Sequence, residues 1–87
     1  MRHARAEDLD RLEPLLVRVR GFAALVERSR GVFYLRSKAF LHFHQDPAGL
    51  FADIRGGPDG GFERLRVDEA AGATALIERI EAVALRG

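Results

Sequence analysis

Cysteine is absent from this chain of 87 residues. Its absence excludes disulfides, thiolate nucleophiles and cysteine-ligated metal sites, and it makes a reducing cytoplasm the default location. No apolar run approaches the roughly 20 residues that a helix needs to cross a bilayer, and the charged N-terminus has no apolar signal core. We therefore expect a cytoplasmic protein without membrane association.

An excess of one charge is also missing. The 14 basic and 13 acidic residues leave a formal net charge of +1, so no global field favours nucleic acid or a membrane surface. Lysine is nearly absent: Lys38 is the single lysine, and the other basic residues are all arginine. A GC-rich bacterial genome produces this bias, so the abundance of arginine does not by itself indicate binding.

The hydrophobic fraction of 47% suffices for one core, and 87 residues are too few for two. We expect a single domain over residues 1–87, with residues 1–6 flexible. From Asp8, leucine and valine recur at steps of three and four, the pattern of an amphipathic helix. Asp8 is its expected N-cap and Gly21 its expected end, while Pro14 either lies in the first turn or kinks the helix.

Short segments rich in β-forming residues dominate the middle of the chain. Residues Phe22 to Arg30 fit either a short helix or an edge strand, and we favour an irregular or edge segment. Gly56 to Gly61 is predicted to be a flexible hairpin loop, because it lacks the ending of a phosphate-binding loop. Four antiparallel strands joined as a meander are predicted at Val32 to Arg36, Ala39 to Gln45, Leu50 to Arg55 and Phe62 to Val67.

The turn Asp46-Pro-Ala-Gly49 sets the register of the second hairpin of this meander. When the turn closes around its central two residues, the core side pairs Leu41 with Ile54, Phe43 with Ala52 and Gln45 with Leu50. The outer side then pairs Phe40 with Arg55, His42 with Asp53 and His44 with Phe51.

The first hairpin has two possible registers. A two-residue turn at Ser37-Lys38 points Val32 and Tyr34 toward the core, whereas a three-residue loop points Phe33 and Leu35 there. We favour the second register, which leaves Tyr34 and Arg36 on the outer face.

The C-terminal segment, Asp68 to Arg86, is predicted to be a helix with Asp68 as its cap and an apolar stripe that includes Leu76 and Ile80. Two amphipathic helices need one shared apolar surface. The predicted fold is therefore α+β: a two-layer sandwich of helix, four-strand antiparallel meander and helix, with both helices on one sheet face.

The stretch Phe33-Tyr-Leu-Arg-Ser-Lys-Ala-Phe-Leu-His-Phe-His44, with a helix before it and strands and a helix after it, resembles the MmcQ/YjbR-like small bacterial proteins. The resemblance covers the element order over about two-thirds of the chain, and its motif reduces to an aromatic, a turn with Lys38, and Phe40. It implies a CyaY-like fold and a role in nucleic-acid binding suggested by that fold. It assigns no functional residues, and another small bacterial family of the same layout is the alternative.

A divalent-metal site is one hypothesis for the outer face. His42 and His44 project from one side of a strand, and Asp53 on the neighbouring strand adds a carboxylate. Surface pairing of histidine with aspartate explains the same pattern without a metal. These three residues are the candidate ligands, and no other cofactor is expected.

The same face is also a candidate interface. Aromatic side chains alternate there with arginine, which suits either a protein partner or stacking on single-stranded nucleic acid. With little net charge, we favour self-association as a homodimer or binding of a protein partner. The candidate interface residues are Tyr34, Arg36, Phe40, His42, His44, Phe51, Asp53, Arg55 and Arg64, joined by Phe62 and Arg66.

Catalysis has weaker support in the sequence. Ser29, Ser37 and Thr74 lack the glycines of a nucleophile elbow and the context of a catalytic motif. Acid-base chemistry by His42 with Asp53 is geometrically conceivable, but the sequence indicates no pocket around them. We therefore expect a protein without enzymatic activity.

Overall fold

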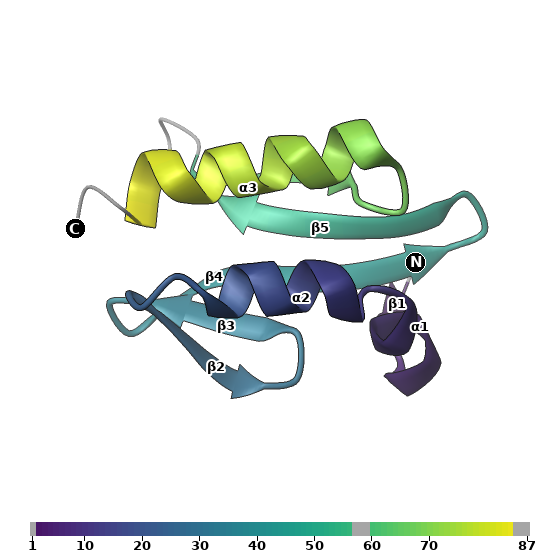
Figure 1. Cartoon of the computed structure of the whole chain (residues 1–87), viewed down its shortest axis with the longest axis horizontal. Coiled ribbons are helices and arrows are strands. Elements are labelled where there is room, and N and C mark those ends of the chain that lie inside the picture. Colours follow the sequence, from purple (N-terminus) through teal and green to yellow (C-terminus); the bar gives the residue numbers. More distant parts are fainter. Residues whose placement is uncertain (1, 57–59, 85–87) are drawn as a thin grey trace.

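Residues 2–56 and 60–84 are described by the computed structural model. They form an antiparallel sheet of six strands and three helices (Figure 1). The element order is β1 (Arg2–His3), α1 (Ala6–Arg11), α2 (Glu13–Arg20), β2 (Leu25–Ser29), β3 (Val32–Leu35), β4 (Lys38–Asp46), β5 (Gly49–Arg55), β6 (Phe62–Arg66) and α3 (Ala70–Ala84).

Arg2 and His3, within the segment that the sequence predicts to be flexible, form strand β1. Strand β1 pairs with the second half of β4, with His3 opposite His44. The backbone N–H of Ala4 donates to Phe43 O at 3.1 Å, which continues the pairing. Arg2 adds an ion pair to Asp8 at 3.2 Å, which connects β1 to α1.

The predicted first helix is divided into α1 and α2 at Leu12. Pro14 lies in the first turn of α2, where a backbone N–H would have no acceptor within the helix. Asp8 is not the N-cap, because it lies inside α1 and its carboxylate accepts the Arg5 N–H at 2.9 Å. Gly21 does end α2 as expected.

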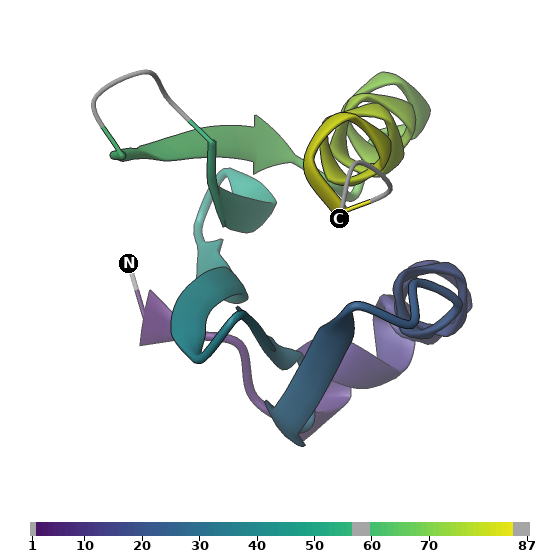
Figure 2. The same cartoon turned by 90° about the vertical axis from the view of Figure 1, so that its left-hand side faces the viewer.

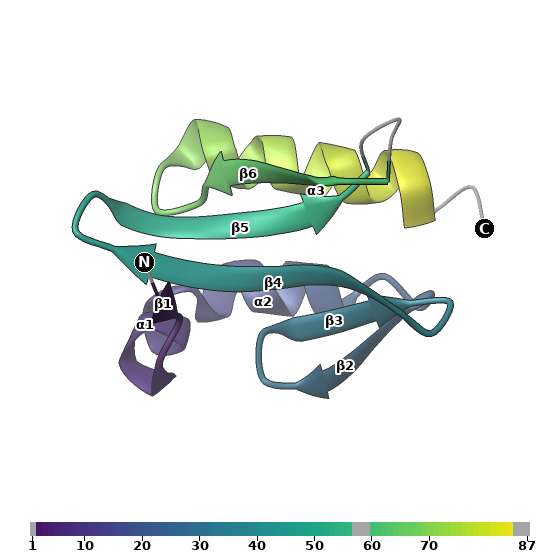
Figure 3. The same cartoon turned by 180° about the vertical axis from the view of Figure 1, so that it is seen from behind.

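The sheet is larger than the predicted meander. Its strand order is β2-β3-β4-β5-β6, and β1 pairs with β4 off this path. The edge segment expected between Phe22 and Arg30 is strand β2. Figure 3 looks onto the face of the sheet that the helices leave open, and we call it the open face.

Helices α2 and α3 lie on the same side of the curved sheet (Figure 2). Their apolar stripes pack against alternate residues of β3, β4 and β5, and this layer is the core. The α+β class is therefore confirmed. The large side chains with the least exposure are Phe33, Leu16, Leu41, Leu50, Ile54, Leu76, Ile80 and Val19.

The second hairpin has the predicted register from Leu41 to Gln45, and the predicted pair of Phe40 with Arg55 is not part of its ladder. His42 lies opposite Asp53, His44 opposite Phe51 and Leu41 opposite Ile54. Proline at the second turn position and glycine at the fourth fixed this register locally.

The first hairpin differs from both predicted registers. Its turn is centred on Arg36 and Ser37, which have φ values of 51° and 68°, and Leu35 pairs with Lys38. Phe33 and Leu35 point inward as predicted. A β-bulge between the pairs Phe33–Leu41 and Tyr34–Ala39 interrupts the alternation of inward and outward side chains along β4. Phe40 is therefore buried in the core, and its predicted place on the outer face is wrong.

The last strand ends earlier than predicted, and the last helix begins later than predicted. Strand β6 ends at Arg66, and α3 begins at Ala70, so Asp68 lies in the connecting turn. Part of the predicted glycine loop, residues 57–59, and the predicted last turn of the helix, residues 85–87, lie outside the described residues. No helix within the described ranges is both long and apolar enough to cross a membrane.

Candidate metal centre

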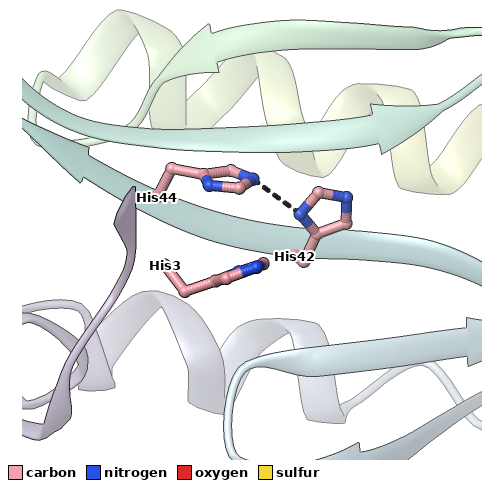
Figure 4. A group of neighbouring side chains, drawn as sticks. All are labelled: His3, His42 and His44. Atoms are coloured by element: carbon pink, nitrogen blue, oxygen red, sulfur yellow. Dashed lines mark hydrogen bonds between the residues drawn. The ribbon is translucent and has the colours of Figure 1, made fainter. Parts of the chain in front are cut away.

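The three histidines of the chain converge on the open face of the sheet. His42 and His44 come from β4, and His3 comes from β1 (Figure 4). One ring nitrogen from each residue can be chosen so that all three nitrogens lie within 4.8 Å of one another. His3 is exposed, whereas His42 and His44 are partly buried.

Strand geometry explains this convergence. Residues two apart on a strand point to the same face, which places His42 beside His44. Antiparallel pairing then sets His3 directly opposite His44, and their rings stack with centroids 4.9 Å apart. The ring of His42 lies edge-on to His44 at 4.7 Å.

His42 and His44 share a hydrogen bond. The Nδ1 atom of His42 lies 2.8 Å from Nε2 of His44, so one ring donates and the other accepts. Burial lowers the pKa of both rings, and the neighbouring His44 lowers the pKa of His42 further. Both effects favour neutral imidazoles, the form that binds metal ions.

Asp53 contacts the histidine cluster from β5. One of its carboxylate oxygens, Oδ2, lies 3.1 Å from Nε2 of His44, and Arg64 donates to both oxygens at 2.7 and 2.8 Å. The hydrogen bonds from Arg64 hold the pKa of this buried carboxyl below its usual range. Asp53 faces His42 in the ladder, as predicted, but its carboxylate contacts His44 diagonally and is not one of the three converging groups.

Phe62 borders the cluster at His42. Its ring lies edge-on to His42 with centroids 5.2 Å apart, and the Arg55 guanidinium lies 4.5 Å above the same ring. Arg55 also donates to the carbonyl oxygens of Ala39 and Gly60, at 2.8 and 3.0 Å. Arg55 is therefore tied to the backbone rather than directed at the histidines.

The other predicted interface residues are dispersed. Tyr34 lies on the open face beneath the Arg28 guanidinium at 4.5 Å, and Phe51 is half-buried on the same face. Arg36 lies in the hairpin turn, and Phe40 is in the core. The structure thus brings together His42, His44, Asp53 and Arg64 but separates them from Arg36 and Phe40.

His3 is the functional candidate that the sequence analysis missed. No strand pattern is recognisable in a two-residue strand, and its pairing depends on the tertiary position of α1. The one available signal was that the chain contains only two other histidines, both on one predicted strand face.

Three imidazoles on one side of a sheet can coordinate a divalent transition metal ion. Ligand nitrogens about 2.0–2.1 Å from a tetrahedral ion lie roughly 3.3 Å apart. The pair of His42 and His44 is closer than this, at 2.8 Å, and the whole group spans at most 4.8 Å. The nitrogen spacings therefore lie on both sides of the spacing that a tetrahedral ion requires.

Comparisons with known proteins give no relative: no family model matches the chain, and neither the curated proteins nor the solved structures contain a match.

Proposed function

We propose that this protein binds a divalent transition metal ion of the zinc type through His3, His42 and His44. The observation that carries the proposal is the convergence of all three histidines, from two strands, within 4.8 Å. Imidazole nitrogen favours zinc, nickel and copper over magnesium and calcium, which prefer oxygen ligands. Three protein ligands leave further positions for water or another ligand.

The surroundings of the histidines support this proposal. Asp53 lies beside His44, with its Oδ2 atom 3.1 Å from Nε2 of that ring. Arg64 opposes a cation, but its charge is balanced by both oxygens of Asp53. The pKa shifts of His42 and His44 leave lone pairs on their rings at neutral pH, so little proton release accompanies binding.

Calorimetric titration and thermal unfolding with zinc test the proposal. At zinc concentrations 100 times Kd, mass action adds about 2.7 kcal/mol of stability, which raises Tm by about 10 °C or more for a domain of this size. His3→Gln and His44→Gln should each abolish most of the shift. Glu81→Gln, which removes an exposed carboxylate on α3, is the matched control and should leave the shift unchanged. An unchanged zinc response in both histidine variants would refute the site.

Self-association through the open face is the second candidate function. Val26 and Phe62, with 56% and 44% of their surface exposed, lie on this face at its two end strands, β2 and β6. A partner that covers the whole face would bury both side chains. Nucleic acid is favoured less, because Arg64 and Arg66 are already paired with carboxylates. Light scattering of wild type and Phe62→Asp tests this candidate. A dimer that the substitution converts to a folded monomer would support it, and a monomer for both would contradict it.

A further inference from the structure

The end of the molecule at the β3–β4 hairpin contains a hollow of about 310 Å³. Its apolar wall includes Leu35, Phe40 and Val83, which come from β3, β4 and α3. This volume is at the lower end of the range for small-molecule sites, which runs from about 300 to 1,000 Å³. The hollow therefore suits a ligand with a small apolar body.

The charged residues that line the hollow are all cationic: Arg36, Lys38 and Arg55. Arg36 and Lys38 are exposed, and neither forms an ion pair with any residue that the structure describes. A smaller hollow beside Val83 contains Glu63, but Arg79 pairs with that carboxylate at 2.9 Å. The electrostatic complement of this rim is thus an anionic group.

Two departures from regular strand geometry shape this hollow. The β-bulge in β4 turns Phe40 inward and makes it part of the wall. Arg36 and Ser37 both have positive φ, the conformation that a two-residue hairpin turn requires, and this turn places Arg36 at the rim of the hollow. Neither departure is explained by the histidine cluster, which uses the other half of β4.

We propose that this hollow binds a small amphipathic carboxylate, with its apolar chain against Leu35, Phe40 and Val83 and its carboxylate at Arg36 and Lys38. The apolar wall contacts the alkyl chain of the ligand, and the two cations at the rim pair with its carboxylate. Arg55 closes one side, where its hydrogen bonds to Ala39 O and Gly60 O hold it in place. This site is separate from the proposed metal centre.

Octanoate titration followed by amide NMR tests the proposal, with octanol and octylammonium as ligands of the same chain length. Octanoate should give saturable shifts at Leu35, Ala39 and Val83, and it should bind about tenfold more tightly than octanol, because hydrogen bonds to charged groups are worth that much or more. Octylammonium should bind more weakly than octanol. Equal affinity for octanoate and octanol, or shifts centred elsewhere, would overturn the assignment.

The double variant Arg36→Asn/Lys38→Gln removes the charge without filling the hollow. Asparagine tolerates positive φ, so the turn should be retained, and an unchanged amide spectrum outside the hairpin checks the fold. Octanoate affinity should fall about tenfold, while octanol affinity stays the same. Arg11→Gln, which removes an exposed arginine that does not line the hollow, is the matched control and should bind octanoate like wild type. Wild-type affinity in the double variant would also overturn the proposal.

Discussion

Strand β4 belongs to two hairpins, one with regular pairing and one with a β-bulge. The β4–β5 hairpin keeps an unbroken ladder around a turn with Pro47 and Gly49. The β3–β4 hairpin has a turn of two non-glycine residues at positive φ and a bulge that buries Phe40. The half of β4 in the β4–β5 hairpin, the regular half, carries His42 and His44 at strand spacing. The half in the β3–β4 hairpin, the irregular half, lines a hollow at the end of the sheet. Regular pairing thus aligns side chains on a face, whereas a bulge redirects one of them into the core.

The largest expected effect distinguishes the phenylalanines of the two hairpins. Phe40→Ala should lower the free energy of unfolding by about 3 to 5 kcal/mol, because it leaves a cavity among buried side chains. Phe51→Ala should cost about 1 to 2 kcal/mol, since Phe51 is half-buried on the open face. Urea unfolding of both variants measures the difference, and equal losses would contradict the burial of Phe40 by the bulge.

The next effect concerns Gly49 in the regular hairpin. Its φ is 154°, and an added Cβ would lie 2.5 Å from Oδ2 of Asp68, whose carboxylate is hydrogen-bonded to Arg66. Gly49→Ala should therefore destabilise the protein by about 2 kcal/mol. Ala48→Gly, at the neighbouring turn position, is the control and should cost less than 1 kcal/mol, or roughly the entropy of one added glycine. Thermal unfolding of the two variants compares them.

A substitution that stabilises the protein is expected at the turn of the β3–β4 hairpin. Ser37→Gly places glycine at a position whose φ is 68° and should raise the free energy of unfolding by about 1 kcal/mol. The same substitution at Ser29, in strand β2, should be neutral or destabilising, because strand glycine loses more conformational entropy. Denaturant midpoints of both variants check the sign, and destabilisation by Ser37→Gly would argue against strain at this turn.

These two turns also explain how much the sequence could predict. Pro47 and Gly49 have local conformational preferences that determine one register, and the pairing of His42 with Asp53 followed from them. Arg36 and Ser37 have no such preference for positive φ, so neither the position of this turn nor the bulge could be derived locally. The buried Phe40 depends on α3 and β3 together, which is a tertiary effect.

The candidate site was also predictable only where local sequence determines the structure. His42 and His44 share a strand face by local periodicity, and Asp53 follows from the hairpin register. His3 reaches the cluster only because β1 pairs with β4 through contacts between Ala4 and Phe43, remote in sequence. Local patterns therefore predicted the half of the site that lies in one hairpin and missed the residue that a long-range pairing supplies.

The smallest expected effect is the pH dependence of stability that His42 and His44, in the regular half of β4, produce in the absence of metal. The folded-state pKa of His42 and His44 lies below the ordinary value of 6.5, mainly because burial disfavours the charged rings. The unfolded state then binds more protons, so the free energy of unfolding falls as pH decreases below about 6.5. The carboxyl pKa values of Asp53, Glu13 and Glu27 are lowered from 3.8 or 4.5, so their contributions are lost only at more acidic pH.

The interval from pH 7 to pH 5 therefore isolates the histidines. Urea unfolding at both pH values should show a loss of stability in wild type that is smaller in His44→Gln, since that variant removes one titrating ring and the charge repulsion on the other. Lys38→Gln, in the irregular half of the same strand, should keep the full wild-type pH dependence. A stability that rises from pH 7 to pH 5 would mean that Asp53 outweighs burial and holds the rings protonated, and the histidine cluster would then be a salt-bridge network rather than a set of neutral ligands.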